Sequence, residues 1–334
     1  MAKQKSLDLA LQGGGAHGAY TWGILDRLLD DEEIEIDGVC GTSAGAMNGV
    51  CLVYGMAKGG RKGAKELLHN FWQEIAESGK HSPLKPSYYD RAKSKGNMNY
   101  SPGYRFFTML SDNISPKHLN PLNHNPLEAV LNKLINFEEL QRLSPPRLFV
   151  CATNVLTCQA RVFGPEEISV KSLLASACLP YLFPAVEING EFFWDGGYMG
   201  NPPLYPLIDN TPDTNDILLV QINPINLSKV PETIEEIRDR VNEISFNSSL
   251  INELKTIKLR QELAEKGVHL DGNHNPIYLH HLSADGDLDE LNLSSKLNTE
   301  WNYLCYLRDT GRKAAEAWIK ENKKFIGVKS TFQI

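Results

Sequence analysis

Apolar and polar positions along the first eighty residues follow two alternating spacings. Short apolar stretches over residues 7–11 and 36–40 have the length of buried strands. Between them, over residues 18–31, apolar residues recur at helical spacing, and this spacing returns over residues 47–52 and 60–75. The order strand, helix, strand, helix predicts a parallel sheet covered by helices.

Residues 80–125 lose this regularity. They are rich in Pro, Asn, Lys, Ser and Tyr, and they contain one apolar and aromatic patch over residues 104–110. A segment of this length with weak periodicity is typical of a functional insertion or lid. We therefore expect it to lie outside the regular sheet.

Regular patterns return after the insertion. Helices are expected over 126–135, 231–266 and 301–320, and strands over 148–153, 191–194, 217–222 and 277–282. The sequence therefore continues to alternate helices and strands to its last quarter.

Composition narrows the class of protein. The 334 residues are 42% hydrophobic, enough for one large domain or two modest ones. The net charge of −7 gives no overall basic footprint for nucleic acid, so no nucleic-acid partner is expected. Six dispersed cysteines without a C-x-x-C pair indicate a reducing compartment. No secretory signal or spanning stretch is evident, so we expect a cytoplasmic location, with signal-independent export left open.

The sequence Gly41-Thr42-Ser43-Ala44-Gly45 fits the G-x-S-x-G pattern of hydrolase nucleophiles. It lies between an expected strand and an expected helix, the context in which a sharp turn exposes the serine hydroxyl. The alternative is a glycine-bounded turn whose serine only caps the next helix. The strand-to-helix context favours the nucleophile.

A second glycine-rich stretch, residues 13–18, follows the first expected strand and fits G-x-G-x-x-G. This pattern is also a dinucleotide fingerprint, with Glu33 or Glu35 near the distance of a ribose-binding acid. In a serine hydrolase the same loop would supply backbone N–H groups to an oxyanion. A nucleotide fold gives no reason for Ser43 after the second strand, so the sequence favours the oxyanion loop.

The serine needs a base, and two arrangements are open. The order Ser43, Asp195, then His280 or His281 would suit a triad. Alternatively, the glycine turn that follows Asp195 presents this carboxylate directly to Ser43. We favour the carboxylate acting alone, with its pKa raised by burial, and expect the two histidines to be ordinary strand residues.

Together, these motifs resemble the patatin-like phospholipase family, and residues 175–184 are similar to a stretch typical of its bacterial members. The resemblance implies that Ser43 is the nucleophile and Asp195 the base. It also implies an α/β class fold, a three-layer α/β/α arrangement with a mostly parallel central sheet. The implied oxyanion-hole residues are Gly13, Gly14 and Gly15, and the other motif glycines are Gly18, Gly41, Gly45, Gly196 and Gly197.

The resemblance covers residues 6–208, the expected catalytic domain, with an insertion or lid at about 80–125. Residues 209–334 are expected to complete the same domain. The implied activity is hydrolysis of lipid acyl esters through an acyl-serine, with no cofactor and no metal. The expected partner is the lipid substrate, with transient contact to a membrane surface left open and oligomeric state undetermined. The alternative is a lipid-binding or regulatory protein of the same fold with little turnover.

Two features of the sequence extend this interpretation. Many members of the family have Arg or Lys where this chain has His17, which would be partly charged near neutral pH, unless it is only a neutral residue at the start of a helix. The patch over residues 104–110 is either ordinary core, or an acyl pocket or a face that contacts lipid headgroups.

Overall fold

The computed structural model describes residues 4–210, 214–267 and 276–332. In this part of the chain, eight strands form one sheet in the order β5-β6-β3-β2-β1-β7-β8, with β4 paired to β3. The strands are β1 (Lys5–Leu11), β2 (Ile34–Thr42), β3 (Arg147–Asn154), β4 (Gln159–Phe163), β5 (Val186–Ile188), β6 (Glu191–Asp195), β7 (Asp216–Gln221) and β8 (Tyr278–Ser283). The sheet is mostly parallel, as the sequence predicts.

Five adjacent strands of the sheet, β3-β2-β1-β7-β8, run parallel to one another. Their register aligns the carboxyl ends, since Leu11 of β1 lies opposite Gly41 of β2, and Thr42 lies opposite Cys151 of β3. The pairs β3–β4, β3–β6 and β5–β6 are antiparallel. The β3–β6 register pairs Ala152 with Asp195, which brings the end of β6 to the edge where the parallel strands end.

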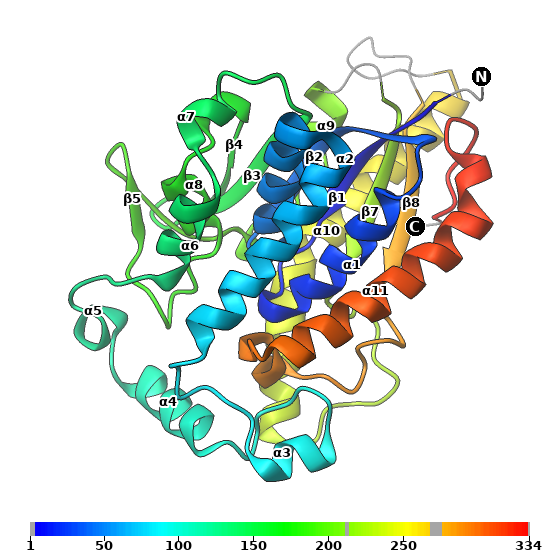
Figure 1. Ribbon diagram of the computed structural model, residues 1–334. Helices are drawn as coiled ribbons and strands as arrows, with labels where there is room; N and C mark the ends of the chain where they lie inside the picture. Colours follow the sequence, from blue (N-terminus) through cyan, green and yellow to red (C-terminus); the bar gives the residue numbers. More distant parts are fainter. Residues whose placement is uncertain (1–3, 211–213, 268–275, 333–334) are drawn as a thin grey trace.

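Helices cover both faces of the sheet (Figure 1). One layer contains α1 (Gly18–Leu28), α2 (Ala44–Gly79) and α11 (Trp301–Asn322), and the opposite layer contains α9 (Tyr205–Asn210) and α10 (Ile234–Glu265). The remaining helices are α3 (Tyr88–Lys93), α4 (Pro102–Asn113), α5 (Pro116–Leu119), α6 (Pro126–Leu134), α7 (Phe137–Leu140) and α8 (Val170–Ser176), with short 3₁₀ turns between elements. The arrangement is therefore a three-layer α/β/α fold.

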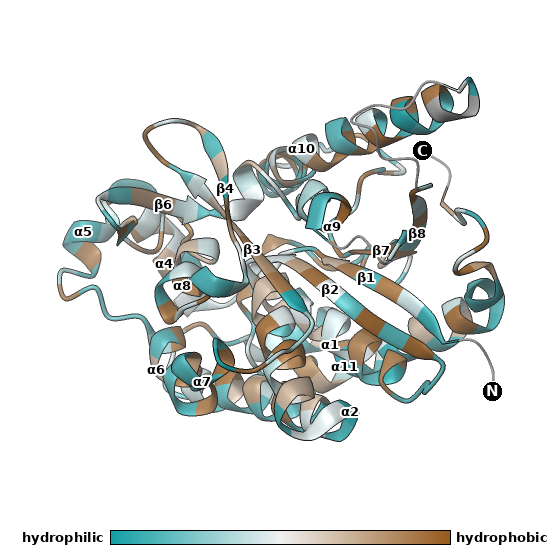
Figure 2. Cartoon of the chain, turned by 90° about the horizontal axis from the view of Figure 1, so that it is seen from above, coloured by the Kyte–Doolittle hydropathy of each residue, from teal (hydrophilic) through white to brown (hydrophobic). Residues whose placement is uncertain are grey.

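Alternation along the strands builds a core on each face of the sheet. Leu9 of β1 joins the large cluster beneath α1, α2 and α11, whereas its neighbour Ala10 joins a smaller cluster with Leu250 and Leu254 of α10. The central strands are hydrophobic over most of their length (Figure 2). This pattern is expected of parallel strands that are covered on both sides.

The long helix α2 contains the two helices that the sequence predicts over residues 47–52 and 60–75. They are separated by a kink at Gly59 and Gly60, whose backbone angles are not helical. Gly60 has a φ of 60°, a conformation that glycine adopts without steric cost. The chain therefore changes direction there without leaving the helical layer.

Residues 80–125 contain α3, α4 and α5, which follow one another along the lower and left-hand edge of the molecule in Figure 1. No residue of α4 is buried, and Phe106 and Met109 are more than half exposed. The interpretation of residues 104–110 as ordinary core is therefore wrong. Tyr104, Phe107 and Leu110 are half-buried, whereas Phe106 and Met109 on the same helix face solvent.

Among the described residues, no helix is both long enough and apolar enough to cross a membrane.

Candidate active site

Ser43 occupies a sharp turn between β2 and α2. Its backbone angles, φ 53° and ψ −122°, lie in a region that residues with a Cβ rarely adopt. Such a conformation costs about 1–3 kcal/mol and persists only where its surroundings fix it. The Ser43 N–H donates to Ser176 Oγ at 2.8 Å, and the Ser43 carbonyl accepts from the Met47 N–H at 3.1 Å. These contacts hold the turn, and Ser43 is only 9% exposed.

The two glycines of the G-x-S-x-G motif lie so close to neighbouring backbone atoms that a side chain would not fit there. A Cβ at Gly45 would collide with the carbonyl oxygen of Leu11 in β1, and a Cβ at Gly41 would lie 2.6 Å from the backbone of Gly45. The helix that follows Ser43 can therefore begin directly against the end of the neighbouring strand.

Asp195 ends β6 and is fully buried. Its Oδ1 accepts a hydrogen bond from the Gly197 N–H at 2.7 Å, while its Oδ2 has no hydrogen-bond partner among the described residues. Burial raises the pKa of the Asp195 carboxyl to about 7, against the opposing effects of the Gly197 N–H, the Ser43 hydroxyl and Lys296. The carboxyl group therefore changes charge near neutral pH.

The structure brings Ser43 and Asp195 to the same end of the sheet. The Ser43 hydroxyl is near enough to favour the Asp195 carboxylate and lower its pKa. The pair nevertheless falls outside the geometry of a formed hydrogen bond, because Oδ2 remains unpartnered. We take the two groups to be neighbours, with the hydrogen bond not yet closed, as is common for catalytic groups without a substrate.

The loop of residues 13–15 lies against the serine turn. A Cβ at Gly13 would come 2.7 Å from the Cβ of Ser43, so only glycine fits at this contact. The Gly13 N–H donates to Asn201 Oδ1 at 2.7 Å, whereas the N–H groups of Gly14 and Gly15 have no acceptor within the described part of the chain. Gly15 has a φ of 59°, which turns the chain into α1. Two free N–H donors thus follow Gly13.

The other motif glycines lie at tight contacts between elements. An added Cβ would meet another atom at 2.7 Å or less at Gly18, Gly196 and Gly197. Gly18 faces Ala44 at the start of α2, and Gly197 faces the ring of Phe246 in α10. These glycines allow the glycine loop, the serine turn and the Asp195 turn to pack closely.

A buried amide network holds the glycine loop, and sequence reasoning missed it. Gln12 Oε1 accepts from the backbone N–H groups of Ile222 and Asn223, each at 2.9 Å, and Gln12 Nε2 donates to Asn247 Oδ1 at 3.0 Å. Asn223 Nδ2 donates to the Gly13 carbonyl at 2.7 Å. Gln12 and Asn223 each follow a buried strand closely, and this is the only sequence signal that could have identified them.

His17 is 3% exposed and neutral. The Ser295 hydroxyl donates to the Asn292 carbonyl at 2.6 Å, so its oxygen accepts from His17 Nε2–H at 2.7 Å. Burial, aided by the nearby Lys296, lowers the pKa of His17 to about 3. Of the two alternatives that the sequence leaves open for this position, the neutral residue at the start of a helix is confirmed, because the side chain faces the interior.

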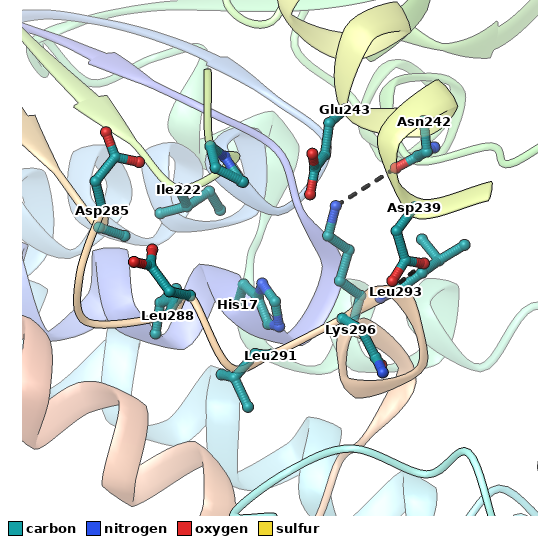
Figure 3. Close-up of a pocket in the computed structure, with 14 residues that line it drawn as sticks. His17, Ile222, Asp239, Asn242, Glu243, Asp285, Leu288, Leu291, Leu293 and Lys296 are labelled. Carbon is teal, nitrogen blue, oxygen red and sulfur yellow. Dashed lines mark hydrogen bonds between the residues drawn. The ribbon is translucent and has the colours of Figure 1, made fainter. Parts of the chain in front are cut away.

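Lys296 lies near His17 and extends toward Asn242 and Glu243 of α10 (Figure 3). Its Nζ donates to Asn223 Oδ1 at 2.8 Å and to Asn242 Oδ1 at 3.4 Å, and burial lowers its pKa. It lines, with His17 and Ile222, a cavity of about 20 Å³. That volume accommodates roughly one water molecule. The cavity therefore has no room for an acyl chain.

The structure does not bring either of the two candidate triad histidines, His280 or His281, to Ser43. His280 shares hydrogen bonds with Asp216 at 2.8 Å and with Thr331 at 2.9 Å, and His281 is paired with Gln221 at 2.9 Å. Both histidines lie on β8, at the edge of the sheet beyond β7. They have the structural roles that the sequence favours for them.

The dinucleotide alternative is also wrong. Glu33 precedes β2 and Glu35 lies at its amino end, where Lys323 binds Glu33 at 2.7 Å. A ribose-binding acid must instead reach the carboxyl ends of the strands, where ligands bind in open α/β sheets. In this chain the carboxyl end of β2 is occupied by the Ser43 turn.

The sequence pattern of the patatin-like phospholipase family matches residues 9–208. This chain belongs to that family, and it is a lipid hydrolase. The matched segment contains the glycine loop, the Ser43 turn and Asp195, the motifs that carried the resemblance in the sequence.

Solved structures similar to this chain include VipD from Legionella pneumophila, with 17% sequence identity and a TM-score of 0.45, covering 95% of this chain and 67% of VipD. The type III effector ExoU matches with 15% identity and a TM-score of 0.36, covering 96% of this chain and 53% of ExoU. The ExoU–SpcU complex from Pseudomonas aeruginosa matches with 17% identity and a TM-score of 0.31, covering 76% of this chain and 52% of the matched one. A search of curated proteins gave no match.

Proposed function

We propose that this protein hydrolyses lipid acyl esters through a Ser43–Asp195 dyad and an acyl-serine intermediate. The observation that carries the proposal is the fully buried carboxyl group of Asp195, which has a pKa of about 7 and lies beside Ser43 at a strained strand-to-helix turn. One oxygen of this carboxyl group has no hydrogen-bond partner in the described part of the chain. A general base works best when its pKa lies near the operating pH.

In the first half of the reaction, the Asp195 carboxylate takes the proton of the Ser43 hydroxyl as its oxygen attacks the ester carbonyl. The carbonyl oxygen becomes an oxyanion, which the free N–H groups of Gly14 and Gly15 stabilise. The positive end of α1 lies close behind them and adds to this stabilisation. Protonated Asp195 then gives its proton to the leaving alcohol, and the acyl-serine remains.

In the second half, Asp195, again ionised, takes a proton from water as the water oxygen attacks the acyl carbonyl. The same N–H groups hold the second oxyanion. Its collapse breaks the bond to Ser43 Oγ, the serine recovers the proton from Asp195, and the fatty acid is released. Protons and charges balance over the cycle without a cofactor.

Three residues position the catalytic groups by hydrogen bonds to the backbone of Gly13 or Ser43. Asn201 Oδ1 accepts the Gly13 N–H, so the oxyanion donors in this proposal are the N–H groups of Gly14 and Gly15. The role of Gly13 is to let the loop lie directly against Ser43. Ser176 fixes the Ser43 backbone, and Asn223 fixes the Gly13 carbonyl.

The test combines a fluorophosphonate label with hydrolysis of a short-chain nitrophenyl ester. Ser43→Ala is expected to abolish both, and Asp195→Asn to lower kcat/KM by about a thousandfold or more. His281→Ala is the matched control and should keep full activity. Full activity in Asp195→Asn together with loss in His281→Ala would show that the dyad is wrong. Folded protein that takes no label and hydrolyses no ester would favour a lipid-binding protein.

A further inference from the structure

The insertion over residues 80–125 differs in charge from the rest of the molecule. It contains seven Lys and Arg side chains and two Asp side chains, a net charge of +5, in a chain whose net charge is −7. Arg91 is paired with Glu300, and Lys80 with Glu77. Within the described residues, Lys93, Lys95, Arg105 and Lys117 are exposed and have no acidic partner. Much of this positive charge therefore faces solvent unneutralised.

The same segment exposes large apolar side chains. They are Tyr88, Tyr89, Tyr100, Phe106, Met109, Ile114, Leu119 and Leu122, with exposures from 37% to 90%. Lys93 Nζ lies 5.1 Å from the centre of the Tyr89 ring, and the Tyr89 and Tyr100 rings meet edge to face at 4.7 Å. Large exposed apolar side chains gathered in one segment are typical of an interaction surface. We call these exposed cations and apolar side chains together the basic–aromatic patch.

The basic–aromatic patch is attached to the active-site end of the molecule. Asp112 of α4 pairs with Arg238 of α10 at 3.2 Å, and α10 places Phe246 against Gly197, two residues from Asp195. The Met98 N–H donates to Ser294 Oγ at 2.8 Å, next to the Ser295 hydroxyl that holds His17. Figure 1 shows α3, α4 and α5 in succession along one edge of the molecule.

We propose that the basic–aromatic patch docks the enzyme on an anionic phospholipid surface, with the active site turned toward it. Basic side chains are attracted to the negative potential of such a surface, and aromatic and aliphatic side chains enter its headgroup region. Neither contribution requires a spanning helix. The proposal rests on the proposed function, because a lipid hydrolase must reach substrate that is packed in an aggregate.

Two binding partners are conceivable for the basic–aromatic patch, a lipid surface and a second copy of this chain, and the positive charge of the patch favours the lipid surface. A neighbouring apolar stripe on and just before α10 (Val230, Ile234, Ile237, Val241 and Ile244) is also exposed, at spacings of four and three residues typical of paired helices. A symmetric pairing through the basic–aromatic patch would place like charges together, which is unfavourable. An anionic lipid surface complements that charge. Dimerisation through the patch is the alternative result that the experiment below distinguishes.

The binding experiment uses Ser43→Ala protein, so that hydrolysis does not alter the vesicles. Sedimentation with phosphatidylcholine vesicles is compared with sedimentation in which about a third of the lipid is phosphatidylglycerol. The test variants are Lys93→Glu/Lys117→Glu and Phe106→Ser/Met109→Ser. The matched controls are Lys320→Glu, an exposed cation on α11, and Leu156→Ser, a 74% exposed leucine outside the patch.

We expect binding to the anionic vesicles to exceed binding to phosphatidylcholine, and to weaken when salt is raised from 0.1 M to 1 M. One basic side chain near an anionic leaflet accounts for roughly a fivefold change in binding, so the double charge reversal should weaken it by at least about tenfold. The double serine variant should also bind less, and both controls should bind normally. Equal binding by test variants and controls overturns the proposal.

Two further measurements separate the docking proposal from the catalytic one. With Ser43 restored, both test variants should hydrolyse a dissolved nitrophenyl ester at the normal rate and vesicle phospholipid more slowly. Vesicle binding that depends on the patch, in a protein that hydrolyses no ester, would support docking and contradict the proposed function. A stable dimer that the test variants dissociate, with unchanged vesicle binding, would overturn docking and favour a second copy.

Discussion

Replacing Asp195 by Asn should stabilise the folded protein while it removes activity. The Asp195 carboxyl is fully buried, and burial raises its pKa from 3.8 to about 7. Asn keeps the oxygen that accepts the Gly197 N–H and has nearly the same shape, but it has no charge to bury. The variant therefore loses the unfavourable burial of a carboxylate and keeps the contact.

The size and pH dependence of this effect follow from the two pKa values. Well below pH 3.8 the carboxyl is protonated in the folded and the unfolded chain, so it gives no pH-dependent difference. Between about pH 4 and pH 7 the unfolded chain releases the proton and the folded chain holds it, so stability falls as the pH rises. At 1.36 kcal/mol per unit of pKa, the loss above pH 7 amounts to about 4 kcal/mol.

The assay is urea unfolding of the unsubstituted protein and of Asp195→Asn at pH 4 and pH 8. The variant should be more stable at pH 8 than the unsubstituted protein, and this advantage should shrink toward pH 4. Asp309→Asn, at an exposed aspartate on α11, is the control and should show no such trend. An advantage for Asp195→Asn that is the same at both pH values would refute the reasoning.

The remaining predictions concern activity. The kcat/KM of ester hydrolysis should fall as the pH drops through about 7, because Asp195 must be ionised to accept the serine proton; a profile flat from pH 5 to 9 would contradict this assignment. Gly13→Ala should lower kcat/KM by about a hundredfold or more, because the added Cβ would lie 2.7 Å from the Ser43 Cβ, whereas Gly164→Ala, where nothing lies within 4 Å, should be silent in the same assay. Ser176→Ala should destabilise the protein by about 1–3 kcal/mol in urea unfolding, because the buried Ser43 N–H loses its acceptor; an unchanged midpoint would count against that role.

The sequence predicts the part of the site that depends on local pattern. Residues 7–11 and 36–40 are apolar runs that end in glycine turns, so the two strands, their parallel order and the position of Ser43 follow from spacing alone. The structure adds about one or two residues at the ends of these strands, where hydrogen bonding continues beyond the apolar run.

What the sequence does not predict depends on contacts between distant residues. Asn201 is 188 positions from the Gly13 N–H that it binds, and Asn223 is 210 positions from the Gly13 carbonyl. An asparagine after a strand has many roles, so its type alone does not assign one. The sequence leaves the charge of His17 open for the same reason, since its environment depends on Ser295 and Lys296, from the last quarter of the chain.

The anchoring of the glycine loop has a consequence for how enzymatic activity arises during synthesis. The family match ends at residue 208, yet the loop is fastened by Asn223, which is itself bound by Lys296. A ribosome-bound chain that has emerged only as far as residue 208 contains Ser43 and Asp195 but still lacks Asn223 and Lys296, which hold the glycine loop. The proposed activity is therefore expected only after the chain has emerged beyond Lys296, and recovery of turnover after denaturation reports that the segments containing Asn223 and Lys296 have docked.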